Sequence, residues 1–174
     1  MKKNKFIGTG VALVTPFNED GSVDYVSLRN LINFDLENGS DFMVALGTTS
    51  ESPTLDDDEK RKVVKTVVDT VAGRCPVLLG MGCNNTAALL KNIERQDFTG
   101  IDGILSVVPY YNKPNQSGMI AHFTAIADAS PVPVVLYNVP GRTGVNMQAA
   151  TTVRLACHDN IVAVKGAFGN LQQI

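Results

Sequence analysis

Short apolar runs rich in β-branched residues alternate along this chain with stretches of helical periodicity. Such alternation is typical of βαβ units, in which helices connect parallel strands. The runs are almost continuously apolar, which indicates strands that are covered on both faces. The apolar runs are "GVALVTPF", "DFMVALGT", "CPVLLGMG", "DGILSVVPY", "VPVVLYNV" and "NIVAVKG". The helical stretches span about 24–38, 56–72, 85–98, 118–129 and 148–157.

The polar residues at the ends of the runs distinguish between two parallel-sheet folds. In a (β/α)8 barrel the C-terminal strand ends converge on one active face, whereas an open doubly wound sheet gathers its ligand groups at one switch point. Nearly every run ends in hydroxyl, amide or amine groups: Thr15, Thr48, Thr49, Asn84, Tyr110, Tyr111, Tyr137 and Lys165. We therefore predict an α/β fold of the (β/α)8, or TIM barrel, type, with about six units present.

Helix boundary signals agree with this alternation. Gly39, Gly73 and Gly100 follow three of the helical stretches, where a left-handed C-terminal residue is often needed. The segment "TLDDDEK" supplies a polar cap and acidic residues for the first turn of another helix. Acidic side chains favour that end because they complement the helix dipole.

Length and charge describe an ordinary globular chain. It has 174 residues, a formal net charge of -2 and 44% hydrophobic residues. No linker interrupts the series, so residues 1–174 are predicted to be the N-terminal part of a single barrel domain. Neither sign of charge dominates, so we expect no nucleic acid or membrane partner. No apolar segment is long enough to suggest a signal peptide or a membrane span.

Cysteine and histidine usage favours neither a disulfide framework nor a metal site. Cys75, Cys83 and Cys157 show no C-x-x-C spacing, which is typical of reduced thiols in the cytoplasm. His122 and His158 lie far apart on stretches with helical character, and we interpret both as ordinary helix residues. No phosphate-binding loop or dinucleotide fingerprint is present, so no cofactor and no metal is expected.

Lys165 stands at the end of the last apolar run. In a barrel it would point into the mouth above an apolar floor, where desolvation lowers the pKa of an ammonium group. A neutral amine attacks carbonyl carbons to give a Schiff base, which then acts as an electron sink. The alternative is a lysine that merely ends its strand and extends into water.

Other polar residues near strand ends fit carbonyl chemistry on a carboxylate-bearing substrate. Tyr137 ends the preceding run, where a phenol could transfer protons, although a half-buried tyrosine with a satisfied hydroxyl is the simpler interpretation. Arg142 follows in a Gly/Pro-rich loop and is suited to a carboxylate, although most loop arginines are solvated. The segment "GTTSE" offers adjacent hydroxyl and backbone N–H groups for an anion.

With these residues the chain resembles the class I Schiff-base lyases related to N-acetylneuraminate lyase. The resemblance is carried by the segments "VALVTPF", "GTTSESPTL", "VPYYNKP", "YNVPGRTG" and "VKGAFGN". These segments cover nearly the whole chain in the order and spacing of the family. Together they are specific, although none would suffice alone.

The resemblance implies an activity within that family. Pyruvate would form an imine with Lys165, lose a proton to give an enamine, and attack L-aspartate 4-semialdehyde. Cyclisation would then give 4-hydroxy-tetrahydrodipicolinate, a precursor of diaminopimelate and lysine. The alternatives are a lyase acting on N-acetylneuraminate or a 2-keto-3-deoxy sugar acid, and a catalytically inactive fragment.

The resemblance also implies roles for single residues. Tyr137, Thr48 and Tyr111 would form a proton relay beside the catalytic Lys165. Family members take the equivalent of Tyr111 from a neighbouring subunit, so a homodimer or homotetramer is expected. Two further residues would hold carboxylates: Thr49 that of pyruvate and Arg142 that of the semialdehyde.

A lysine-binding groove is implied at a second place. Asn84 and Tyr110 match positions that line this groove between subunits in lysine-sensitive relatives. Ala88 stands where sensitive members usually carry an acid that holds the ammonium group of the ligand. Weak feedback by lysine is therefore expected.

Three departures from the family pattern bear on activity. Ser50 replaces a usual glycine, which would cost stability if the position requires a positive φ. Gly166 and Phe168 replace a usual acid and a usual hydroxyl residue after the lysine. The third departure is length, because a complete barrel needs eight units and about 250 residues. We therefore expect the chain, taken alone, to be neither an active nor an independently stable monomer.

Overall fold

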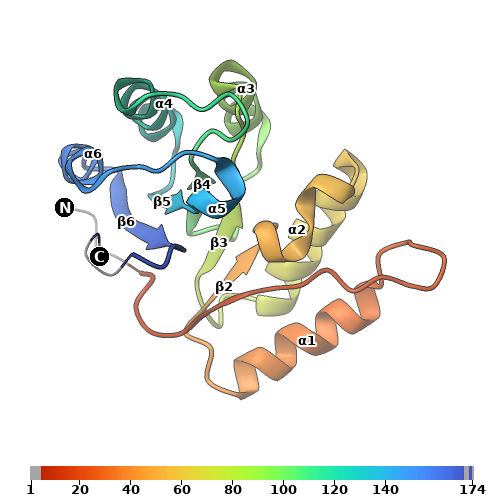
Figure 1. Cartoon of the computed structure of the whole chain (residues 1–174). Coiled ribbons are helices and arrows are strands. Elements are labelled where there is room, and N and C mark those ends of the chain that lie inside the picture. Colours follow the sequence, from red (N-terminus) through yellow and green to blue (C-terminus); the bar gives the residue numbers. More distant parts are fainter. Residues whose placement is uncertain (1–4, 171–172, 174) are drawn as a thin grey trace. The chain divides into compact units, whose positions relative to one another are not determined.

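All six predicted strands are present in the computed structural model, which describes residues 5–170 and 173. The chain divides into two compact units (Figure 1). The N-terminal unit comprises Lys5–Gly80 and Thr99–Asp102, and the C-terminal unit contains Met81–Phe98 and Gly103–Ile174.

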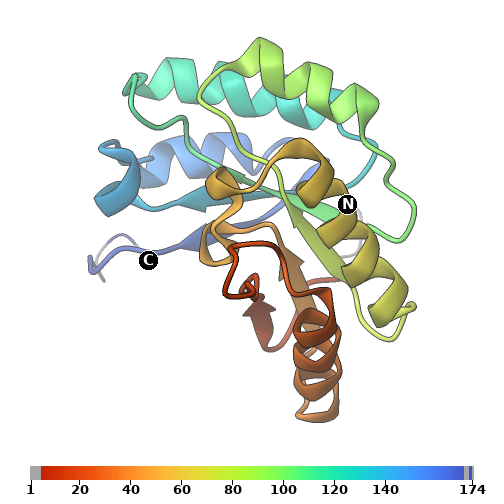
Figure 2. The same ribbon diagram turned by 90° about the vertical axis from the view of Figure 1, so that its right-hand side faces the viewer.

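The N-terminal unit contains three parallel strands and two α-helices among its described residues. Its strands pair in chain order: β1 (Gly10–Ala12), β2 (Phe42–Ala45) and β3 (Val77–Gly80). Helices α1 (Tyr25–Glu37) and α2 (Asp57–Val71) lie side by side in both ribbon views (Figures 1 and 2). The helices bury apolar side chains at helical spacing: Leu28 and Ile32 on α1, and Val63, Val67 and Val71 on α2.

The ends of α1 and α2 confirm the boundaries predicted from the sequence. The Asp24 carboxylate accepts hydrogen bonds from the first turn of α1. Asp56 and Glu59 form a capping box at α2, with N···O distances of 2.8 and 2.9 Å. Gly39 and Gly73 follow the two helices with positive φ, as expected for residues that end helices.

The C-terminal unit repeats the same pattern. Three helices pack on one face of its strands, and their inner side chains form a core around Phe123, Met119, Ile104 and Leu136 (Figure 1). The strands again pair in parallel and in chain order: β4 (Gly103–Val107), β5 (Val134–Asn138) and β6 (Ile161–Gly166). The packed helices are α3 (Thr86–Arg95), α4 (Gln116–Ala129) and α6 (Ala149–Leu155).

The strand order within each unit supports the barrel prediction. Neighbouring strands are consecutive in the chain and parallel, and neither set of three strands contains a reversal of order. Parallel strands that pair in chain order and are joined by helices are the β/α units from which a (β/α)8 barrel is built.

The pairing of β5 with β6 contains a one-residue shift. Val134 pairs with Ile161, but Val135 pairs with Ala163, so Val162 is an extra residue on β6. From there the register continues to Tyr137 opposite Lys165. An extra residue of this kind re-aims the side chains that follow it, because successive residues point to opposite faces.

Some local elements differ from the sequence-based expectations. Helix α4 begins two residues earlier than expected, because the Asn115 side chain caps it by accepting the Gly118 N–H. Three short helical turns were not predicted: α5 (Pro140–Thr143), η1 (Thr48–Ser50) and η2 (Ser52–Thr54). The prediction of a loop around Arg142 was therefore wrong, since Pro140 starts a helical turn there.

The two histidines occupy different environments. His122 lies in α4 as predicted, but His158 lies in the turn after α6, where its Nε2 atom is 3.0 Å from a carboxylate oxygen of Asp128. The prediction of a helical His158 was wrong because α6 ends at Leu155. All three cysteines are free thiols.

Residues 5–170 and 173 contain neither a membrane-spanning helix nor a cluster of metal-binding side chains. None of the helices described there has the length and apolar character needed to cross a membrane. The same residues contain no group of three His, Cys, Asp or Glu side chains that could hold a metal ion.

His122 is a polar group inside the core of the C-terminal unit. Its Nδ1 atom is 2.8 Å from the Thr86 hydroxyl at the start of α3, and its ring meets Phe123 edge-on. Its Nε2 atom is buried without a hydrogen-bond partner among the described residues. Burial lowers the pKa of this imidazole from 6.5 to about 4, because the charged form would lose its hydration.

We predict that His122 makes the chain less stable in mild acid. The unfolded imidazole binds a proton near pH 6.5 and the folded one only near pH 4. The free energy of unfolding therefore carries no penalty from His122 above pH 6.5. It falls by up to roughly 3 kcal/mol as the pH drops to about 4, because only the unfolded chain then gains a proton readily. Urea unfolding at several pH values should show a steeper loss for the parent chain than for His122→Gln. Equal pH slopes in the two proteins would contradict the prediction.

Candidate active site

Lys165 and Tyr137 meet at the C-terminal ends of β6 and β5. They are paired residues in the strand register, so their side chains share one face. The Lys165 Nζ atom lies 4.9 Å from the centroid of the Tyr137 ring, within the range of a cation–π contact. The one-residue shift at Val162 produces this arrangement, since an unshifted register would place Val164 opposite Tyr137.

The surroundings of Lys165 differ from the buried setting that we expected. Tyr137 is buried, but Lys165 is exposed, as are Val164 and Gly166 beside it. Among the described residues β6 is the last strand in the sheet order, so one of its edges lacks a neighbouring strand there. The amine is thus accessible on the same face as the phenol.

Arg142 lies in a short segment that follows Tyr137. This segment begins with α5, which carries Arg142 as an exposed side chain. The Thr143 hydroxyl donates to the carbonyls of Val139 and Val145, which fixes the turn internally. The Asn138 side chain joins β5 to Met147 at the far end of the segment. Sequence reasoning missed Asn138, although its place between Tyr137 and the turn was a signal.

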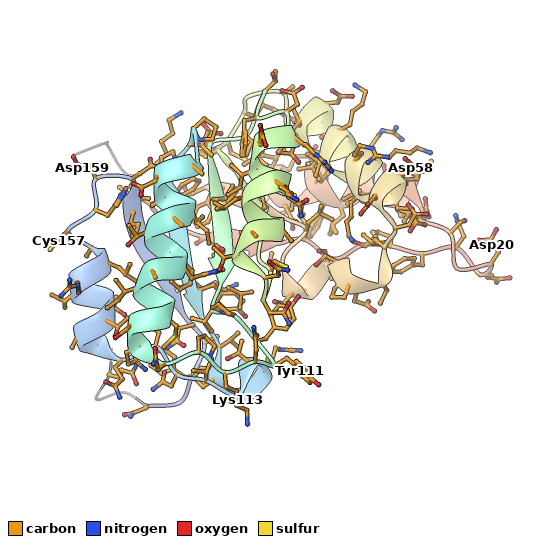
Figure 3. The ribbon with its side chains drawn as sticks, turned by 90° about the horizontal axis from the view of Figure 1, so that it is seen from above. Asp20, Asp58, Tyr111, Lys113, Cys157 and Asp159 are labelled. Carbon is orange, nitrogen blue, oxygen red and sulfur yellow. The ribbon has the colours of Figure 1, made fainter. Side chains whose placement is uncertain are left out.

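A strained loop follows β4 and projects at the same end of the C-terminal unit. Tyr111 and Lys113 both adopt left-handed backbone conformations, with φ values of 70° and 46°. Such values are unfavourable for bulky residues and cluster at functional sites. The Tyr111 side chain is 87% exposed. Figure 3 shows Tyr111 and Lys113 at one end of the unit and Asp159, just before β6, at the other.

Asn112 connects this loop to the two residues assigned to the lysine groove. Its side chain donates to the Asn84 carbonyl at 2.9 Å, and its backbone N–H donates to the Tyr110 carbonyl at 2.9 Å. Burial, and to a smaller extent the nearby Cys83 thiol, raises the pKa of Tyr110. The structure therefore brings Asn84 and Tyr110 together through a residue that the sequence did not single out.

The threonine pair belongs to the N-terminal unit, in the turn after β2. Leu46, just before it, has a φ of 51°, and a side chain at Gly80 would collide with the Leu46 carbonyl. Glycine at position 80 thus lets the backbone bend into η1, which carries Thr48 and Thr49 as exposed side chains. The structure brings Lys165 together with Tyr137 and places the threonines in the other unit.

Ser50 does not have the strained backbone that would favour glycine. It lies in η1, and the positive φ values nearby belong to Leu46 and Glu51 instead. Its hydroxyl donates to the Gly47 carbonyl at 2.7 Å, and its own carbonyl accepts from the Thr15 hydroxyl at 2.8 Å. Serine is therefore accommodated here, and the expected cost from a positive φ does not arise.

Comparison with known proteins places these features in one family. The sequence model of the dihydrodipicolinate synthetase family matches residues 5–174. A protein of Parabacteroides distasonis, named 4-hydroxy-tetrahydrodipicolinate synthase, is 54% identical over 168 residues, covering 96% of this chain and 57% of its own. A protein of the same name from Phocaeicola vulgatus is 52% identical over 175 residues, covering 100% of this chain and 59% of its own.

Solved structures agree with this assignment. Dihydrodipicolinate synthase from Aquifex aeolicus superposes with a TM-score of 0.90 at 44% identity, covering 97% of this chain and 57% of that one. The enzyme from Thermotoga maritima gives a TM-score of 0.94 at 42% identity, covering 98% and 58%.

The similarity extends over most of this chain but over only part of each relative. The chain spans between 57% and 59% of the length of the two curated relatives compared above. The fold is a (β/α)8 barrel fold, represented here by six strands. The chain belongs to the dihydrodipicolinate synthetase family.

Proposed function

We propose that the protein to which this chain belongs condenses pyruvate with L-aspartate 4-semialdehyde to give 4-hydroxy-tetrahydrodipicolinate. The observation that carries the proposal is the pairing of Lys165 with Tyr137, at 4.9 Å, in a chain about half identical to synthases of that name. The chain would supply the N-terminal part of a single barrel domain.

In this proposal Lys165 is the nucleophile. Its neutral amine adds to the carbonyl carbon of pyruvate, water leaves, and a protonated imine forms. Loss of a methyl proton gives an enamine, whose carbon attacks the aldehyde of the second substrate. The amino group of that substrate then attacks the imine carbon, which closes the ring and releases Lys165.

Proton transfer and substrate binding fall to the neighbouring polar groups. Tyr137, on the same face of the sheet as Lys165, serves as the first proton carrier, and Thr48 and Tyr111 complete the relay. Thr49 binds the carboxylate of pyruvate. Arg142, exposed on α5, binds the carboxylate of the semialdehyde through its guanidinium fork.

Two further observations bear on ligands and assembly. A relative from Acinetobacter baumannii, 43% identical, was solved in complex with pyruvate. The exposure of Tyr111 suits a side chain that enters the site of a second copy, so we propose a homodimer or homotetramer. One related synthase is described as a monomeric variant.

A sibling lyase acting on a sugar acid is the second candidate within the enzymes. It would share the lysine and the tyrosine, but sugar-acid lyases of the resembled family usually carry other residues in place of Arg142 and the paired threonines. The compared curated relatives carry the synthase name, which also favours condensation over sugar-acid cleavage. Product analysis after incubation with each substrate class separates the two.

We predict that Lys165 is the residue that pyruvate labels in any complete version of this protein. Reduction with borohydride should fix the imine as a secondary amine on the peptide that contains Lys165. Lys165→Ala should remove this mass, whereas Lys113→Ala, which alters an exposed lysine near the same end, should retain it. Label on Lys113, or no labelled peptide, would reject the proposed nucleophile.

A second prediction concerns inhibition by lysine. A related enzyme from Cyanidioschyzon merolae, 47% identical, was solved with lysine bound. Here position 88 is an alanine, half-buried on α3, so a charge-assisted contact worth about 1.5–3 kcal/mol is missing. Lysine should therefore bind roughly 10- to 100-fold more weakly than to an Ala88→Glu variant.

Calorimetric titration with lysine would measure this difference in affinity. Ala87→Glu is the matched control, because it adds the same charge to an exposed neighbouring position of α3. Inhibition of the unmodified protein by micromolar lysine, or equal gains from both glutamates, would contradict the assignment of the groove.

The residues after Lys165 compensate for one another. A side chain at Gly166 would have its Cβ atom 3.0 Å from Cε1 of the Phe168 ring, closer than an ordinary contact. Phe168 thus occupies the space that the usual acidic residue would need. The two departures from the family pattern are therefore neighbours in space in this chain.

We therefore predict that Gly166→Glu destabilises the chain by about 1 kcal/mol and that Phe168→Ser relieves the loss. Urea unfolding of the two single variants and the double variant gives the coupling energy directly. Gly169→Glu is the control, since a Cβ atom there would meet nothing within 4 Å. Additive effects at positions 166 and 168 would show that the ring and the missing acid are independent.

A further inference from the structure

Asn138 is a buried amide at the end of β5 whose side-chain atoms are all used. Only 1% of its surface is exposed. Its Nδ2 atom donates to the Asn146 side-chain oxygen at 2.8 Å and to the Met147 carbonyl at 3.2 Å. Its Oδ1 atom accepts from the Met147 N–H at 3.1 Å. The amide thus binds both backbone groups of Met147, as a neighbouring strand would.

The backbone of Asn138 is bound to the strand that carries Lys165. Its carbonyl accepts the Ala167 N–H at 2.9 Å, and the register places it opposite Gly166. Tyr137 and Asn138 point to opposite faces, so the phenol faces Lys165 while the amide faces the Met147 backbone. One residue therefore connects the lysine strand to the segment after β5.

That segment, residues 139–147, carries Arg142. It leaves β5 at Val139, forms α5 and returns to Asn138 at Met147, so the Asn138 amide closes it at its base. Gln173 adds a second support by donating to the Met147 carbonyl at 2.7 Å. Arg142 is exposed. The hydrogen bonds from Asn138 and Gln173 fix the backbone segment from which its side chain extends.

We propose that Asn138 is the positioning residue for the carboxylate of the second substrate. It holds the Arg142 segment at a fixed place relative to β6, and the inference rests on the proposed function. Asparagine suits the task because the Met147 backbone offers one donor and one acceptor, which an amide satisfies together. A carboxylate offers acceptors only, and alanine offers neither.

Asn160 provides a matched control at the other end of β6. It is also buried, and its Nδ2 atom donates to the carbonyls of Ala127, Ser130 and Val132 at 2.9–3.2 Å. Asn160→Ala therefore removes a similar set of buried hydrogen bonds without touching the Arg142 segment. A role confined to stability would make the two alanine variants behave alike.

The first experiment measures position on the whole chain without requiring turnover. In Asn138→Ala the Met147 amide should exchange with deuterium at least tenfold faster, and trypsin should cleave faster after Arg142. The Ala167 amide, bound to the backbone carbonyl, should be unchanged. Neither signal should move in Asn160→Ala. Unchanged exchange at Met147, or an equal response in both variants, would overturn the positioning role.

The second experiment measures the consequence for binding. In the complete protein to which this chain belongs, Asn138→Ala should raise KM for L-aspartate 4-semialdehyde at least tenfold, with KM for pyruvate and borohydride trapping at Lys165 unchanged. A similar rise in KM for both substrates would overturn the proposal. Absence of trapping in the complete parent protein would instead reject the proposed function, and the exchange and cleavage data would still decide whether Asn138 positions the segment.

The Asn138→Asp variant separates the two hydrogen bonds to Met147. Ionised aspartate accepts from the Met147 N–H but repels the Met147 carbonyl. At pH 8 trypsin should therefore cleave after Arg142 faster in this variant than in the parent chain. Cleavage at the parent rate would remove the bond to the Met147 carbonyl as part of the anchor.

Discussion

The parallel pairing of β5 with β6 is the constraint on which the functional end of the C-terminal unit depends. It sets Tyr137 opposite Lys165 on one face and directs the Asn138 amide to the other. Both orientations follow from strict alternation of side chains along a strand. The proposed site and part of its support are thus set by the same backbone hydrogen bonds between β5 and β6.

Buried amide and imidazole groups join further loops and helices of the C-terminal unit by hydrogen bonds. Asn138 binds Met147, Asn160 binds three carbonyls at the opposite end of the strands, and His122 links α4 to the Thr86 hydroxyl. Such groups are costly inside a core unless they are hydrogen-bonded. Their bonds are directional, so they select one arrangement of loops where apolar contacts alone would tolerate several. His122 has one buried nitrogen without a hydrogen-bond partner among the described residues, so its polar atoms are the least well satisfied of the three.

Much of this arrangement could be predicted from the sequence because its signals are local. Apolar runs identified all six strands, and the Asp24 and Asp56 caps identified helix starts. The meeting of Lys165 with Tyr137 followed from their places at successive strand ends. The helical turn at Arg142 and the cap at Asn115 were missed, because short polar segments fit several backbone conformations equally well.

Other features were beyond sequence reasoning because they depend on distant residues. The shift at Val162 arises only when β6 pairs with β5, and no property of Val162 marks it as an extra residue. The left-handed backbones of Leu46 and Tyr111 contradict their side-chain preferences and are imposed by surrounding structure. Asn138 and Met147 are nine positions apart, and only the folded turn brings them together.

The extra residue on β6 lets the strand keep its pairing with β5 at both ends. Ile161 lies opposite Val134 and Lys165 lies opposite Tyr137, although β6 uses one more residue than β5 between these two pairs. Deleting Val162 would close the bulge and leave Lys165 opposite Tyr137. The strand would lose the local bend and the added twist that an extra residue produces. The bulge therefore sets the course of β6 across the unit, whereas the pairing with β5 decides which residue meets the phenol.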